Sequence, residues 1–149
     1  ILLERVNQNH RADLTTLGVV ANEAAYAEGA EWFEQANAYI DGSHTFIENY
    51  FRNNIPNVGY THNEGTFMTF LDFSDVMSSI GAEERYMEND HQSPEHYFRD
   101  WLVYESGIYM NPGSSFGEGG AGHMRMNTAS SRIVLQEVLD SLAAAVRNV

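Results

Sequence analysis

Apolar residues recur every three or four positions along residues 15–54, and this long helical period constrains the fold more than any other sequence feature. The recurring apolar positions are Leu17, Val20, Ala24, Trp32, Phe33, Ala36, Ile40, Phe46, Ile47, Tyr50 and Phe51. Gly29 and the stretch Asp41-Gly42-Ser43 are expected to interrupt the helical region. Pro56 is expected to end it, because the residue before a proline avoids the helical conformation.

A strand is predicted over residues 65–73, where β-branched and aromatic residues follow one another. Its apolar side chains alternate between two sides, with Phe67, Leu71 and Phe73 on one and Met68 and Phe70 on the other. Since both sides are apolar, this strand is expected to be covered on both faces. The polar and acidic residues 74–92 that follow show no regular period, and we expect an irregular stretch there.

Two further helices are predicted in the second half of the chain. Residues 93–107 begin with Ser93 as N-cap and Pro94 in the first turn, and Gly107 is a stop signal. The last helix, at residues 130–146, has an apolar stripe made by Val134, Val138, Leu139, Leu142 and Val146. Its amphipathic character predicts that one side packs on a sheet.

Short strands complete the pattern, at residues 108–110 and 123–127. The predicted class is therefore α/β, more specifically a two-layer α+β arrangement. We expect long N-terminal helices, a small mixed or antiparallel sheet covered by helices, and a C-terminal amphipathic helix. The length of 149 residues suits a single domain over residues 1–149.

The composition excludes several classes of function. The formal net charge is −13, and the eight basic residues are all Arg and do not cluster, so we expect no nucleic-acid partner. No apolar run is long enough to cross a bilayer, so we expect no membrane partner. Cysteine is absent, which excludes disulfides and thiolate catalysis and favours a cytoplasmic location. Because residue 1 is Ile, we expect a cut-out domain or a processed fragment.

The segment GEGGAG at residues 117–122 has the glycine spacing of the dinucleotide-binding fingerprint. That fingerprint works only where a strand enters the glycines and a helix leaves them. Here a Pro-Gly turn enters and a strand leaves. We therefore interpret the segment as a loop that joins two strands.

The strand HMRMN at residues 123–127 carries the strongest candidate for a binding residue. Met124 and Met126 share one face, while His123, Arg125 and Asn127 share the other. A polar face in such a domain must be turned towards something polar. Arg125 at its centre can clamp a carboxylate or a phosphate with two hydrogen bonds. The alternative is an ion pair between Arg125 and one of the many acidic residues.

Other residue groups have simpler interpretations. Asp90, His91, Glu95 and His96 are of metal-ligand types, but their spacing does not place two His on one helical face, so a solvated loop at a helix start is expected and no metal site. The aromatic residues Tyr26, Trp32, Tyr39 and Trp101 are expected to pack rather than to form a ligand cage. His123 lies on the face of Arg125 and is either part of the same cleft or a surface residue.

The run MNPGSSFGEGGAGHMRMNTASSR, residues 110–132, resembles the C-terminal signature of class I and II aminotransferase-type enzymes of fold type I, which use pyridoxal phosphate (PLP). The resemblance is to the cystathionine beta-lyase-like (C-S lyase) branch, in which a Pro-Gly turn, a Phe-Gly pair, a Gly-rich loop, an Arg-x-Asn strand and an Arg-led helix follow in this order. ANEAAYAEGAEWFEQANAYI resembles the interdomain helix of that branch, and EGTFMTFLDF its first small-domain strand.

The resemblance implies that the chain is the small C-terminal domain of a homodimeric aminotransferase or C-S beta-lyase, and that it closes over an active site built mainly by a missing large domain. It implies that Arg125 binds the α-carboxylate of an amino-acid substrate. The lysine that binds PLP in this family lies in the large domain, and this chain has no Lys. We therefore expect no catalytic residue and no bound cofactor in the chain alone.

Two departures from the family pattern are noted. Ser130-Ser131 stands where the family often has Cys-Pro, and the acidic stretch 74–92 is longer than expected, which leaves the substrate open. The alternative function is a stand-alone acidic binding module that reuses the fold without catalysis.

Overall fold

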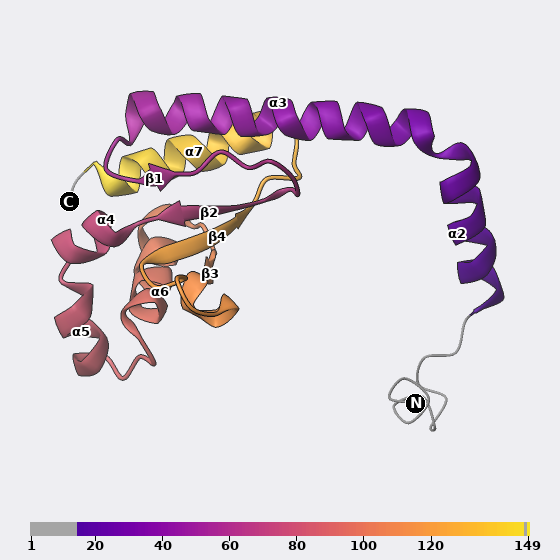
Figure 1. Ribbon diagram of the computed structural model, residues 1–149. Helices are drawn as coiled ribbons and strands as arrows, with labels where there is room; N and C mark the ends of the chain where they lie inside the picture. The colour runs from indigo at the N-terminus through magenta and orange to yellow at the C-terminus, as the bar shows by residue number, and fades with distance from the viewer. Residues whose placement is uncertain (1–14, 148) are drawn as a thin grey trace, which may run out of the picture. The chain divides into compact units, whose positions relative to one another are not determined.

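The computed structural model describes residues 15–147 and residue 149 (Figure 1). By their contacts the residues form two compact units, Ile1–Tyr39 and Ile40–Val149. The described part of the first unit is helical, and the second unit combines helices with a small sheet. The predicted α+β class, with long N-terminal helices and a C-terminal helix, is confirmed.

The N-terminal helical region consists of α2 (Thr16–Glu28) and α3 (Ala30–Asn54). The break at Gly29 and the end before Pro56 are confirmed. The predicted interruption at Asp41-Gly42-Ser43 is wrong, because α3 continues through it. A single Gly inside a helix costs only about 1 kcal/mol, and burial of Ile47 and Phe51 on the following turns outweighs this cost.

The sheet has four strands in the order β1-β2-β4-β3, and every neighbouring pair is antiparallel. The strands are β1 (Gly59–Tyr60), β2 (Met68–Asp72), β3 (Asn111–Pro112) and β4 (His123–Asn127). The predicted strand at 123–127 is confirmed in full. The strand predicted at 65–73 is shorter, and the one predicted at 108–110 is displaced to β3.

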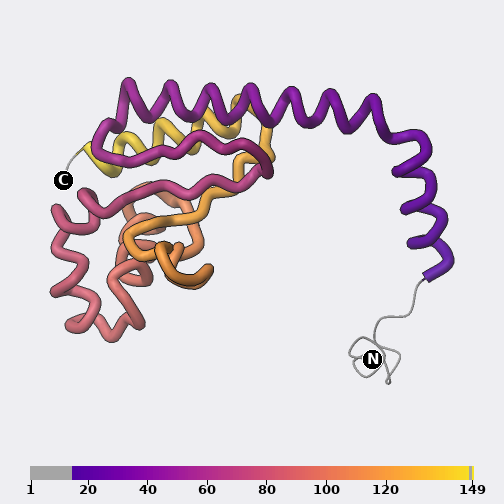
Figure 2. Tube along the Cα trace, in the orientation of Figure 1, coloured from indigo at the N-terminus to yellow at the C-terminus, as the bar shows by residue number. Residues whose placement is uncertain are grey.

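Helices α6 (Pro94–Ser106) and α7 (Arg132–Val146) belong to the second unit, together with the C-terminal part of α3. The Cα trace in Figure 2 shows α7 running beside α3. Hydrogen bonds join these helices: Arg132 Nη1 donates to the Gly42 carbonyl at 2.8 Å, Arg132 Nη2 donates to the Ser43 hydroxyl at 3.2 Å, and the Tyr50 hydroxyl donates to Asp140 at 2.5 Å. Burial and the bond to Asp140 raise the pKa of Tyr50 to about 12.

The start and stop signals predicted for α6 are confirmed, and the structure adds a cap for α7. Ser93 caps α6, Ser131 caps α7, and Gly107 ends α6 with a φ of 73°. The stripe predicted for α7 is partly wrong, because Val134 is 44% exposed whereas Leu135 is 2% exposed. The strongest buried positions of this helix are Leu135, Leu139, Leu142 and Val146.

Most of residues 74–92 are helical rather than irregular. They form α4 (Ser74–Ser79) and α5 (Ala82–Glu88). Val76, Met77 and Ile80 recur at helical spacing and are buried in the core, but the polar residues around them hide this period in the sequence. Among the described residues, no helix combines the length and the apolar character that crossing a bilayer requires.

Candidate functional site

The sheet of the second unit has one buried and one open face. Because side chains alternate along a strand, Leu71 of β2 and Met124 of β4 share the buried face. On the opposite face, Phe70 of β2 lies across from Arg125 of β4. Phe70 is 36% exposed, so the prediction that residues 65–73 are covered on both faces is wrong for the described chain.

Arg125 lies at the centre of this open face. Its register partners are Phe70 on one side and Asn111 of β3 on the other. The side chain is half-buried, and its guanidinium carbon lies 4.2 Å from the centre of the Phe116 ring. Within the described chain, no carboxylate forms an ion pair with it. The alternative in which an acid of this chain neutralises Arg125 therefore does not hold for the described residues.

The guanidinium of Arg125 is buried at its Nε end. Its Nε atom is buried and has no hydrogen-bond acceptor in residues 15–147 and 149. A buried N–H without an acceptor costs about 1 to 3 kcal/mol. No carboxylate of the described residues pairs with the terminal nitrogens of Arg125, so these donors can serve a ligand.

Phe116 is the aromatic partner of Arg125. It ends the short 3₁₀ helix η2 (Gly113–Phe116), and its ring is 50% exposed. Phe70 contacts this ring edge-on, with the ring centres 5.7 Å apart and an interplanar angle of 84°. Sequence reasoning identified neither aromatic residue as part of the site, because their meeting depends on strand register and on the path of a loop.

The glycine segment 117–122 connects η2 to β4, as the sequence predicts for a loop between strands. Gly113 and Gly120 approach each other so closely that a Cβ on either would overlap the backbone of the other. At the end of the segment, the Gly122 carbonyl accepts a hydrogen bond of 2.9 Å from the Phe73 N–H. The glycines therefore allow the loop to pack on itself and against the end of β2.

Glu95 anchors the same loop from α6. Its carboxylate accepts a hydrogen bond of 3.1 Å from the Gly122 N–H and one of 2.6 Å from the Ser93 hydroxyl. Burial raises the pKa of Glu95, but these bonds and that of its own N–H outweigh burial, so the pKa lies below its ordinary value. The prediction of a solvated loop is wrong for Glu95, which is 6% exposed.

Of the other residues of metal-ligand type, His96 lies near Glu95, because both contact the Ser93 hydroxyl. His91 contacts Asp100 at 3.1 Å, and His96 contacts the Ser93 hydroxyl at 2.9 Å. In the described part of the chain, no group of three or more such side chains could hold a metal ion.

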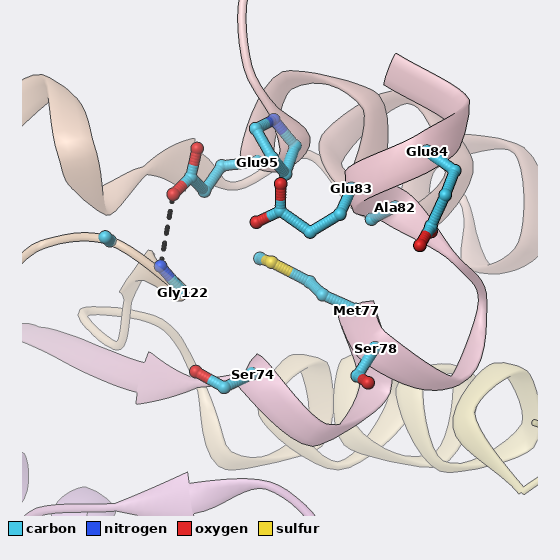
Figure 3. Close-up of a pocket in the computed structure, with 10 residues that line it drawn as sticks. Ser74, Met77, Ser78, Ala82, Glu83, Glu84, Glu95 and Gly122 are labelled. Atoms are coloured by element: carbon cyan, nitrogen blue, oxygen red, sulfur yellow. Dashed lines mark hydrogen bonds between the residues drawn. The ribbon is translucent and has the colours of Figure 1, made fainter. Parts of the chain in front are cut away.

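A cavity of about 390 Å³ lies beside the glycine segment, between it and α4 and α5 (Figure 3). Glu83, Glu84 and Glu95 line it, together with Ser74 and Met77. Figure 3 shows the Glu95 carboxylate directed at the Gly122 N–H. Three carboxylates disfavour an anionic ligand here, so an anion is expected at Arg125 instead.

His123 shares the open face with Arg125 and is half-buried. Its Nδ1 donates a hydrogen bond of 2.8 Å to the Ala121 carbonyl. The register partner of His123 is Asp72. Burial raises the pKa of Asp72, but hydrogen bonds from Ser74 and the nearby His123 lower it below its ordinary value. The open face therefore carries both the Arg125 cation and the Asp72 carboxylate.

The aromatic residues expected to pack behave differently in the two units. Trp101 stacks on Phe98 with the ring centres 5.5 Å apart, which confirms packing. In the first unit, Tyr26 and Trp32 are largely exposed, so packing within the described chain is wrong for these two. A hollow of about 710 Å³ is lined by Tyr26, Trp32, Phe33, Ala25, Gly29 and Ala30.

No model of a known protein family matches the chain. A candidate cystathionine beta-lyase of Mycobacterium tuberculosis is 30% identical over 135 residues, which cover 87% of this chain and 32% of that protein. A solved candidate aminotransferase from Clostridium difficile 630, with bound PLP, has a TM-score of 0.78 at 28% identity. The match covers 97% of this chain and 34% of the aminotransferase chain.

Cystalysin from Treponema denticola, whose solved structure contains pyridoxal 5'-phosphate, has a TM-score of 0.75 at 26% identity. The match covers 95% of this chain and 32% of cystalysin. The chain therefore spans about a third of the length of the relatives that it matches.

Proposed function

We propose, from the chain's similarity to PLP-dependent C-S lyases and aminotransferases, that Arg125 binds the α-carboxylate of an amino-acid substrate. The resemblance of the chain to that branch is confirmed by these relatives. The observation that carries the proposal is a guanidinium on a rigid strand, on the open face of the sheet, without an acid of the described chain to neutralise it.

The geometry suits a carboxylate. A guanidinium fork can donate two parallel hydrogen bonds to the two oxygens of a carboxylate, and each charge-assisted bond contributes about 1.5 to 3 kcal/mol. The strand pairing on both sides of Arg125 limits the movement of its backbone. Holding a substrate in one orientation is what such a rigid clamp contributes to catalysis.

PLP, when bound, supplies the electron sink for chemistry on the amino acid. This chain contains no Lys, so the amine that binds PLP covalently comes from outside residues 1–149. The residues present therefore fit substrate binding and do not fit cofactor attachment. We propose that the chain closes over an active site formed mainly by a large domain of a homodimeric aminotransferase or C-S beta-lyase.

The surface of the first unit supports a large partner domain. Leu17, Val20, Tyr26, Trp32 and Phe33 are all exposed on α2 and the start of α3. So many large apolar side chains in one small unit are typical of a surface that another protein part covers.

Substitution of Arg125 in the full-length enzyme tests the proposal. We expect Arg125→Ala to lower kcat/KM for amino-acid substrates by about 3 to 5 kcal/mol in activation free energy. Arg125→Lys should recover only part of this loss, because a point charge does not reproduce the fork. Steady-state kinetics measures both effects.

The control is the matching amine that lacks the carboxylate. Arg125→Ala should lower kcat/KM for this amine much less, since the amine has no carboxylate for Arg125 to bind. Equal losses for the amino acid and the amine would refute carboxylate binding by Arg125.

A further inference from the structure

From the aromatic contacts on the open face of the sheet, we infer that Phe116 is a positioning residue that holds the Arg125 guanidinium in the plane in which it receives the substrate carboxylate. This inference rests on the proposed function of Arg125. Its first support is the 4.2 Å separation between the guanidinium carbon and the centre of the Phe116 ring. That separation is well within the range of about 6 Å over which a cation is attracted to an aromatic face.

An aromatic ring and a carboxylate hold an arginine in different ways. A carboxylate occupies the N–H donors of the guanidinium, whereas a ring covers one flat side and leaves the donors in the plane free. Within the described residues, Arg125 has the ring and no carboxylate. The contact therefore orders a long side chain without competing with a ligand for its donors.

The two ends of the guanidinium complete the argument. Nε is buried and without an acceptor in the described chain, so a ligand approaches from the opposite edge, where the terminal nitrogens are. With one flat side covered by Phe116, a carboxylate is directed into the guanidinium plane. In that plane both of its oxygens can accept a hydrogen bond.

Phe116 is itself fixed by two features of the chain. Phe70, on the neighbouring strand, contacts its ring edge-on at 5.7 Å. The close approach of Gly113 and Gly120 holds η2 against the loop that leads into β4. Phe116 and Arg125 are nine positions apart, and this folding back brings them together. The glycine segment thus serves to place an aromatic ring.

The test compares Phe116→Leu with Phe116→Tyr in the full-length PLP enzyme. Leu keeps an apolar side chain but removes the ring face, so KM for an amino-acid substrate should rise about 5- to 20-fold. The change in kcat should stay within about twofold, because the cofactor chemistry is untouched. Tyr keeps the ring and should restore KM to within about threefold of the original value.

The matched control is Tyr109→Leu, which removes the ring that Arg99 contacts at 5.8 Å on the surface of the same unit. It should leave KM unchanged. The second substrate is the amine without a carboxylate, whose kinetics should not respond to Phe116→Leu. If Phe116→Leu does not fold, Phe116→Met, whose unbranched and flexible side chain can adapt to the space of the ring, is measured in the same way.

The outcomes separate this inference from the proposal on which it rests. Suppose that Arg125→Ala lowers kcat/KM for the amino acid much more than for the amine, but Phe116→Leu leaves KM unchanged. Then the role of Phe116 is refuted and carboxylate binding by Arg125 stands. A loss from Phe116→Leu that is equal for both substrates means that Phe116 only supports the fold, and it also refutes the inference. If Arg125→Ala lowers kcat/KM equally for the amino acid and the amine, the proposed function of Arg125 is refuted, and the inference about Phe116 is refuted with it.

Discussion

Arg125 keeps its hydrogen-bond donors available because an aromatic ring, and no carboxylate of the described chain, lies against it. In a protein with a net charge of −13, an arginine without an acidic partner is unexpected on charge grounds alone. The acids on the open face are placed elsewhere: Asp72 accepts a hydrogen bond from the Ser74 N–H at 2.9 Å. The Asp72 carboxylate is therefore hydrogen-bonded at the start of α4.

Glu95 is the acidic residue whose removal should affect the glycine segment most. Glu95→Ala leaves the Gly122 N–H without its acceptor in a half-buried position. We expect the free energy of unfolding at pH 7 to fall by about 1 to 3 kcal/mol. Glu95→Gln keeps an oxygen that can accept this bond and should lose less. Chemical denaturation of the three proteins measures the difference.

The same carboxylate predicts a dependence on pH. The pKa of Glu95 is lowered in the folded protein, so its stabilisation is complete above the unfolded pKa of about 4.5 and is lost as pH falls through the folded pKa. The stability difference between the original protein and Glu95→Gln should therefore shrink on acidification below pH 4.5. A difference that grows in acid would contradict the assignment.

At the scale of elements, α7 shows how tertiary contacts select among apolar residues. Val134 and Leu135 are neighbours on the first turn, but only Leu135 reaches the core. We expect Leu135→Ala to lower the free energy of unfolding by about 2 to 5 kcal/mol, because it leaves a cavity.

Val134→Ala is the control in the same turn. Its exposed side chain leaves no cavity, so the change should stay within about 0.5 kcal/mol. Thermal or denaturant unfolding measures both variants. If both substitutions lowered the free energy of unfolding by similar amounts, Val134 would belong to the core-facing stripe after all.

At the scale of the whole molecule, the first unit exposes more apolar surface than a stable monomer usually does. Trp32, which is 74% exposed, lines the hollow at Gly29 together with Phe33. In residues 1–149 alone, we expect this surface to cause self-association, measurable by light scattering.

Trp32→Glu should weaken that association, because it places a charge in the apolar hollow. Tyr104→Glu is the matched control: Tyr104 is an exposed aromatic residue of α6, outside this hollow. A monodisperse monomer of the unsubstituted chain would count against the patch. An equal effect of both substitutions would show that charge alone, and not this surface, governs association.

The sequence by itself determined the features that depend on local chemistry. The cap at Ser93, the break at Gly29 and the strand 123–127 follow from neighbouring residues, because caps, breaks and alternation act over a few positions. The alternation in HMRMN also separates Arg125 from the buried Met124 and Met126, as the structure confirms.

Only the tertiary structure decided which apolar residues are covered and which groups meet. Residues 74–92 read as irregular because α4 and α5 are short, and burial of Val76 and Ile80 against distant elements stabilises them. The open side of β2 has the same apolar composition as a covered one. The contact of Phe116 with Arg125 depends on a register and a loop path that no local pattern specifies, since both arise from pairings between residues far apart in the chain.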